Sequence, residues 1–179
     1  RNGVRVGDEV VSTADLGGLP GIQMILADPG VQAGVFEVPT ETLIELGHGC
    51  DRYDVVGVLN SSPQTRELHA DILRRAHQAV VLNAEDPSCL AIRFAASASR
   101  HILVSTDYEV VALHIAVGGD AVYLENAGGR CWMTLAEGET TTRLSAVDGT
   151  TSDPVPMMFA AALAWAQGID PAIIAEALA

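Results

Sequence analysis

The sequence predicts an α/β fold with a mainly parallel sheet flanked by helices, and the order of its apolar segments carries that prediction. Short apolar runs alternate with segments of helical periodicity, the pattern of βαβ units joined by right-handed crossovers. These runs are continuously apolar, as in strands covered on both faces. In residues 121–144, apolar and polar residues instead alternate, and the segment contains the turn signal Asn126-Ala127-Gly128-Gly129. This pattern predicts a small antiparallel three-stranded addition.

The strands are predicted from apolar runs bounded by turn residues. Gly7-Asp8 is a turn-prone pair, so the stretch around it reads as two short strands. In chain order the predicted strands lie in 3–11 (two), 33–38, 54–59, 78–83 and 101–105, and the antiparallel ones in 121–135 (two) and 139–144.

The helices are predicted from apolar periodicity and from Pro or Asp at their starts, since Pro fits the first turn and Ser or Asp caps it. Such starts occur at Pro39, Ser61-Ser62-Pro63, Asp86-Pro87 and Asp170-Pro171. In chain order the predicted helices cover 22–27, 40–46, a segment after Pro63, 87–97, 107–117, 155–167 and 171–179.

Charge and composition exclude several functions. The net charge is −13, which argues against nucleic acid and anionic membranes as partners, because phosphate binding needs clustered cations. All ten basic residues are Arg, so this chain contains no P-loop lysine, Schiff-base lysine or carbamoylated lysine. No apolar run approaches 18 residues, so the sequence predicts no membrane span. The first ten residues lack the apolar core of a signal peptide.

The cysteines and the Ala-rich helix bear on location and assembly. Cys50, Cys89 and Cys131 are scattered and form no CxxC pair, so we interpret them as buried thiols of a protein in the reducing cytoplasm. The helix over 157–167 is interpreted as core, with a homo-oligomer face as the alternative.

Three polar segments follow predicted strands, where ligands gather in parallel sheets. Glu37 ends the run 33–38 and is a candidate Mg²⁺ ligand, or an exposed loop residue. Asn60 ends the next run and either orients a ligand or caps a turn. Asn83 ends the third and can read a purine edge with its amide. Asp86 follows three residues later, and its spacing alone favours the cap of the next helix over a ligand contact.

The chain resembles the central ATPase domain of the Mur ligases, and specifically the Mur-like part of cyanophycin synthetase. The similarity runs from about Gly7 to Ala179, and no single motif decides it. The segments that carry it are GVFE at 34–37, GHGCDRYDVVGVLN at 47–60, VVLNAEDP at 80–87, GGDAVYLE at 118–125 and LAWAQGI at 163–169.

The resemblance implies one Mur-ligase-like domain over 1–179 that takes part in ATP-dependent joining of a carboxylate to an amine. It implies that Glu37 holds Mg²⁺, that Asn83 and Asp86 bind the adenosine part of ATP, and that Asn60 lies in the same cofactor site. The family's P-loop and C-terminal ligase domain are expected to lie outside the region matched here.

The matched region also departs from the family where phosphate and metal are handled. Gln64 and Thr65 stand where the family has an Asp-His pair, and 39–45 lacks the family's Arg and Gly residues. We therefore expect no catalytic residue in this chain acting alone. The alternative hypothesis is a pseudoenzyme that serves as a scaffold, an oligomerisation module or a nucleotide-binding module.

Overall fold

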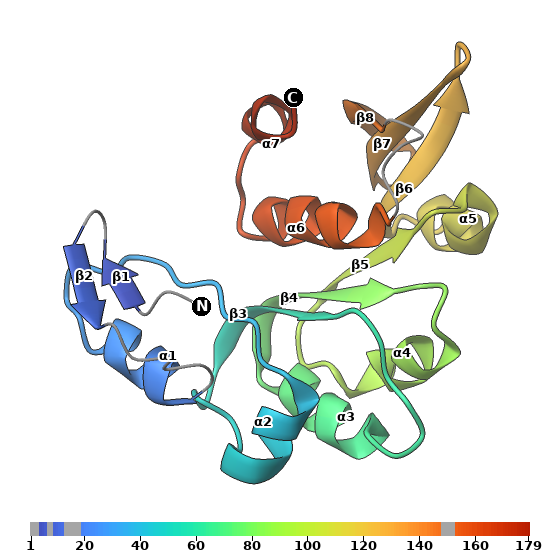
Figure 1. Ribbon diagram of the computed structural model, residues 1–179. Coiled ribbons are helices and arrows are strands. Elements are labelled where there is room, and N and C mark those ends of the chain that lie inside the picture. Colours follow the sequence, from blue (N-terminus) through green and yellow to red (C-terminus); the bar gives the residue numbers. More distant parts are fainter. Residues whose placement is uncertain (1–3, 7–8, 13–18, 148–152) are drawn as a thin grey trace. The chain divides into compact units, whose positions relative to one another are not determined.

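The structure is a computed structural model that describes residues 4–6, 9–12, 19–147 and 153–179 (Figure 1). The chain divides into two compact units, Arg1–Asp51 and Arg52–Ala179. The expectation of one Mur-ligase-like domain over the whole chain stays a prediction.

The first unit contains the predicted pair of short strands and two helices. Strands β1 (Val4–Val6) and β2 (Glu9–Ser12) pair antiparallel, as expected from the turn signal between them. Helices α1 (Leu19–Leu26) and α2 (Thr40–Leu46) follow. Gly47 ends α2 with a φ of 73° and donates its N–H to the Leu43 carbonyl, a left-handed C-terminal position that favours glycine.

The strand predicted over 33–38 is wrong, because this segment has no regular structure and pairs with no described strand. Val35 is 92% exposed, so the apolar run is not covered as a buried strand would be. A Cβ on Gly34 would lie only 2.6 Å from the Phe36 ring, which shows that this ring folds back over its own backbone. The apolar run therefore contacts itself locally instead of entering a sheet.

The second unit is built on one six-stranded mixed sheet, and its strands lie side by side in chain order. The first four are parallel and the last three are antiparallel, so the antiparallel strands continue the parallel sheet through the strand they share. The strands are β3 (Tyr53–Val58), β4 (Ala76–Asn83), β5 (Arg100–Ser105), β6 (Asp120–Ala127), β7 (Arg130–Glu137) and β8 (Thr140–Val147).

Helices cover both faces of this sheet (Figure 1). Because the parallel strands follow one another in space, right-handed crossovers put all the connecting helices on one face. The connecting helices are α3 (Arg66–Arg74), α4 (Pro87–Ile92) with the 3₁₀ turn η1 (Arg93–Ala95), and α5 (Tyr108–Ala116). Helices α6 (Val155–Ala166) and α7 (Pro171–Ala177) pack on the other face.

Strand β4 shows why the parallel strands are continuously apolar. Val80 and Leu82 pack in the cluster beneath α3–α5, whereas Ala79 and Val81 pack in the cluster beneath α6. All four side chains are fully buried. Both faces of the strand therefore require apolar residues.

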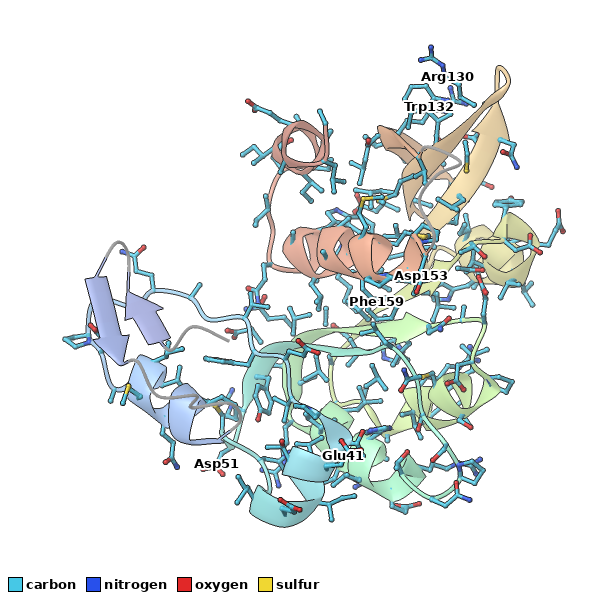
Figure 2. The ribbon with its side chains drawn as sticks, in the orientation of Figure 1. Glu41, Asp51, Arg130, Trp132, Asp153 and Phe159 are labelled. Carbon is cyan, nitrogen blue, oxygen red and sulfur yellow. The ribbon has the colours of Figure 1, made fainter. Side chains whose placement is uncertain are left out.

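Helix α6 belongs to the core, which confirms the preferred interpretation of the Ala-rich segment. Met158, Phe159 and Trp165 are buried against the sheet, and Figure 2 shows Phe159 between α6 and the strands. None of the helices in the described part of the chain is both long and apolar enough to cross a membrane.

Several predicted helix boundaries differ from the structure; the first helix, for example, covers Leu19–Leu26 instead of 22–27. The helix expected directly after Pro63 begins at Arg66, because Ser62 and Thr65 bind each other in a turn: the Ser62 N–H donates to Thr65 Oγ1 at 3.1 Å. Such short polar side chains compete with the helix for backbone groups. The helix predicted to reach Ser97 ends at Ile92 and continues only as η1.

Candidate functional site at the carboxyl edge of the sheet

The loops after β3 and β4 meet at the carboxyl edge of the parallel strands, as the sequence predicts. Asn60 follows β3 and is exposed, and Asn83 is the last residue of β4 and is half-buried. The Ser61 N–H donates to Asp86 Oδ2 at 2.8 Å, which ties the loop that carries Asn60 to the loop that carries Asp86. Three of the four predicted site residues therefore belong to one edge of one sheet.

Asp86 holds this edge together. Besides the bond from Ser61, its Oδ1 accepts the Ser88 N–H at 2.7 Å and the Cys89 N–H at 3.3 Å, so it is the N-cap of α4 as well. Burial alone would raise the pKa of Asp86, but the three backbone donors outweigh it and hold that pKa below its ordinary value. The capping interpretation is thus confirmed, and the bond to Ser61 extends it.

The stability that Asp86 contributes should depend on pH. Since its pKa is lower in the folded chain than the ordinary 3.8, its contribution is present above that value and is lost as the pH falls through the folded pKa. We expect Asp86→Asn to lower the free energy of unfolding by about 1 kcal/mol near pH 7 and by much less at about pH 3. Urea unfolding at both pH values measures this.

The control for that experiment is Glu139→Gln, which removes one exposed carboxylate from the β7–β8 turn. It should leave the free energy of unfolding nearly unchanged at about pH 7, as expected for an exposed surface position. An Asp86→Asn loss of equal size at both pH values would contradict the assigned role.

Asn83 uses one of the two polar groups of its side-chain amide within the protein. Its Oδ1 accepts the Glu85 N–H at 2.9 Å, which fixes the orientation of the amide group. Within the described residues its side-chain NH₂ donates to no protein group. The edge therefore offers one positioned amide donor to a ligand.

Glu85 links this edge to the loop after β5. It accepts hydrogen bonds from the Ser105 hydroxyl at 3.0 Å, from the Thr106 hydroxyl at 2.7 Å and from the Thr106 N–H. Burial alone would raise the pKa of Glu85, but these donors prevail and lower it. Oε1 of Glu85 is therefore already engaged by donors of the protein.

Ser61 and His69 form a second contact at the same edge. The Ser61 hydroxyl lies 2.9 Å from Nδ1 of the buried His69. Burial lowers the pKa of His69, and the nearby Asp86 carboxylate only partly offsets that effect. A neutral imidazole can accept a hydrogen bond from the Ser61 hydroxyl, and the pair orders the loop between β3 and α3.

Glu37 lies in the first unit, is exposed and ends no strand, so the strand-end position expected for it is wrong. Its expected role in binding Mg²⁺ stays a prediction. The described residues contain no group of three or more His, Cys, Asp or Glu side chains arranged to hold a metal ion. At the carboxyl edge, Asp86 and Glu85 accept bonds from protein donors instead. The residues present there do not fit a Mg²⁺ site.

Glu85, the Ser105–Asp107 loop and the Ser61–His69 contact were not predicted from the sequence. The polar segment Ser105-Thr106-Asp107 begins at the last residue of β5, at a strand end like the polar segment after β3, so the same strand-end rule would have found it. His69 has no comparable signal, because it is eight residues from Ser61 and meets it only through the turn before α3.

No protein-family model matches the chain, and no curated protein matches it. These comparisons leave the Mur-ligase resemblance without support and without contradiction.

Proposed function

We propose that the chain is a portion of an ATP-dependent carboxylate–amine ligase of the Mur and cyanophycin synthetase type, and that it supplies the adenosine-binding edge without being catalytic on its own. The observation that carries the proposal is the fixed side-chain amide of Asn83, which lies at the carboxyl edge of adjacent parallel strands. The neighbouring loop, which contains Asn60, is bound to Asp86. Ligands of open α/β sheets bind at this edge.

The geometry favours recognition of a nucleoside. Because Oδ1 accepts the Glu85 N–H, the orientation of the Asn83 amide is fixed, and its NH₂ can donate to a ring nitrogen of a purine. Asp86 keeps its charge because its pKa is lowered, and a carboxylate oxygen has capacity for a further bond from a ribose hydroxyl.

The same edge is poorly suited to the phosphates. Its carboxylates Glu85, Asp86 and Asp107 repel a triphosphate, and phosphoryl transfer depends on neutralising that charge. In the proposed ligase the phosphate and metal contacts therefore come from other parts of the protein. Such a ligase would work in the cytoplasm, where cysteines stay reduced, and Cys50, Cys89 and Cys131 form no disulfide in the structure.

The alternative is a pseudoenzyme in which the edge has only a structural role. Asp86, Glu85 and the Ser61–His69 contact would then serve to join loops, and α/β scaffolds of this kind also serve as oligomerisation modules. A homo-oligomer belongs to this alternative. A pseudoenzyme that serves as a scaffold or an oligomerisation module differs from the ligase portion in whether the edge binds adenosine, whereas a nucleotide-binding pseudoenzyme shares that binding.

Asn83→Asp tests the proposal, because an aspartate still accepts the Glu85 N–H but has no NH₂ donor. Isothermal titration with adenosine and with Mg-ATP is expected to show adenosine binding to the unmodified chain at about millimolar concentration, weakened about tenfold or more by the substitution. Mg-ATP should bind no more tightly than adenosine.

Asn126→Asp is the matched control, since Asn126 is exposed on β6 in the β6–β7 hairpin. It should leave adenosine binding unchanged. Absence of adenosine binding, or equal weakening by both substitutions, would favour the pseudoenzyme.

A further inference from the structure

A pocket lies at the opposite edge of the sheet, where the parallel strands begin. It has a volume of about 610 Å³, within the range of small-ligand sites. Its lining comes from η1, from the starts of β5 and β6, from the end of α5 and from the last residue of β7. All of these elements belong to the second unit.

Part of the lining is committed to holding the fold. Arg100 pairs with Asp120 at 2.6 Å and lies over the Trp165 ring at 4.3 Å. Nε2 of His114 lies 3.1 Å from the carbonyl oxygens of His101 and Asp120, and since carbonyls only accept, this nitrogen carries the proton and bridges β5 and β6. These groups form the wall of the pocket.

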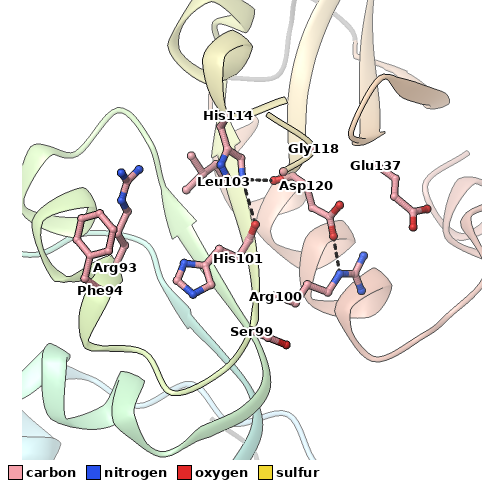
Figure 3. A pocket seen from close by; sticks show the side chains of 11 residues that line it. Arg93, Phe94, Ser99, Arg100, His101, Leu103, His114, Gly118, Asp120 and Glu137 are labelled. Atoms are coloured by element: carbon pink, nitrogen blue, oxygen red, sulfur yellow. Dashed lines mark hydrogen bonds and ion pairs between the residues drawn. The ribbon is translucent and has the colours of Figure 1, made fainter. Parts of the chain in front are cut away.

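Two oppositely charged groups in the lining have no such hydrogen-bonding or ion-pair partner among the described residues. Within the described residues, neither the Arg93 guanidinium nor the Glu137 carboxylate makes an ion pair or a side-chain hydrogen bond. Figure 3 shows Arg93 with Phe94 at one end of the pocket and Glu137 at the other. The pocket thus carries a separated positive and negative charge that do not neutralise each other.

The rest of the lining adds an aromatic side chain and an imidazole nitrogen. Arg93 lies over the Phe94 ring at 4.4 Å, and that ring is 79% exposed, which is unusual for phenylalanine. His101 points its Nε2 at the Ala98 carbonyl at 3.1 Å, so Nδ1 is the nitrogen left to meet a ligand. One end of the pocket therefore combines a cation, an apolar ring and an imidazole.

We propose that this pocket binds a zwitterion of the size of a short peptide, with its carboxylate at Arg93 and its ammonium group at Glu137. Arginine matches a carboxylate with two parallel N–H donors, and a glutamate accepts the N–H bonds of an ammonium group. The volume exceeds what a single small amino acid fills, and the charges stand at opposite ends, as they do at the two ends of a peptide. Phe94 offers an apolar contact for a side chain next to the carboxylate. The proposal is independent of adenosine binding at the other edge.

The test uses the dipeptide alanyl-phenylalanine and its two blocked forms, followed by ¹H–¹⁵N spectra of the chain. The free dipeptide should shift the amide signals of pocket residues such as Phe94, Gly118 and Gly119 at about millimolar concentration. Acetylation of its amino group or amidation of its carboxylate should each weaken binding about tenfold or more.

Arg93→Gln and Glu137→Gln should each weaken binding of the free dipeptide to the same degree. Arg130→Gln and Glu139→Gln remove the same charges from exposed positions outside the pocket and should leave binding unchanged. The spectra also report whether each variant is folded. No shift with the free dipeptide, or shifts that neither blocking nor the two pocket substitutions alter, would overturn the proposal.

Discussion

Phe159→Ala is expected to lower the free energy of unfolding by about 3–5 kcal/mol, the loss typical of removing a fully buried aromatic ring. Phe159 is 2% exposed and lies between α6 and the sheet, in the cluster that contains Ala79, Val81 and Val104. Strands β4 and β5, which carry these three residues, are each paired on both sides and can move little to fill the space that the ring leaves. Chemical denaturation followed by circular dichroism measures the loss.

Phe94→Ala is the matched control, because it makes the same chemical change at a ring that is 79% exposed. It should change the free energy of unfolding by less than about 1 kcal/mol. Similar losses in the two variants would show that burial of Phe159 is not what stabilises the second unit.

Gly119→Ala is expected to cost about 1–3 kcal/mol for a different reason. A Cβ at this position would lie 2.4 Å from Cε1 and Nε2 of His114, closer than atoms can approach. The imidazole would have to leave its place, and the carbonyl oxygens of His101 and Asp120 would lose their donor. The substitution therefore acts through His114 and not through the backbone conformation of residue 119.

A double-mutant cycle isolates that mechanism. In a chain that already carries His114→Ala, the additional Gly119→Ala change should cost less than about 1 kcal/mol, because the clashing ring is absent. Denaturant unfolding of the four variants gives the coupling. Equal costs of Gly119→Ala with and without His114 would contradict the steric explanation.

Much of the second unit follows from local sequence signals. The runs that became β4 and β5 are apolar on both faces, and that pattern alone predicts a sheet covered by helices on both sides. The glycine pair at 128–129, both at positive φ, marks the β6–β7 turn correctly. Asp86-Pro87 and Asp170-Pro171 mark the starts of α4 and α7, because an Asp cap and a Pro at the first position act within one turn of helix.

The segment 33–38 shows where such signals fail. Its composition suits a strand, but a strand exists only if another strand pairs with it, and pairing is not a local property. In the structure its residues are largely exposed, and the Phe36 ring turns back on Gly34. For that reason Glu37 does not lie at the end of a strand, where the sequence predicts it.

Local sequence was sufficient to specify the α/β class, the order of most elements and the placing of Asn60, Asn83 and Asp86 near strand ends, because these depend on periodicity and on caps that act over a few residues. Only the tertiary structure showed which loops bind each other, as the loop of Ser61 binds Asp86. Only the tertiary structure showed, too, that Arg93 and Glu137 line the same pocket. Those contacts join residues 25 or more positions apart, and they are set by strand order and packing, which no short stretch of sequence encodes.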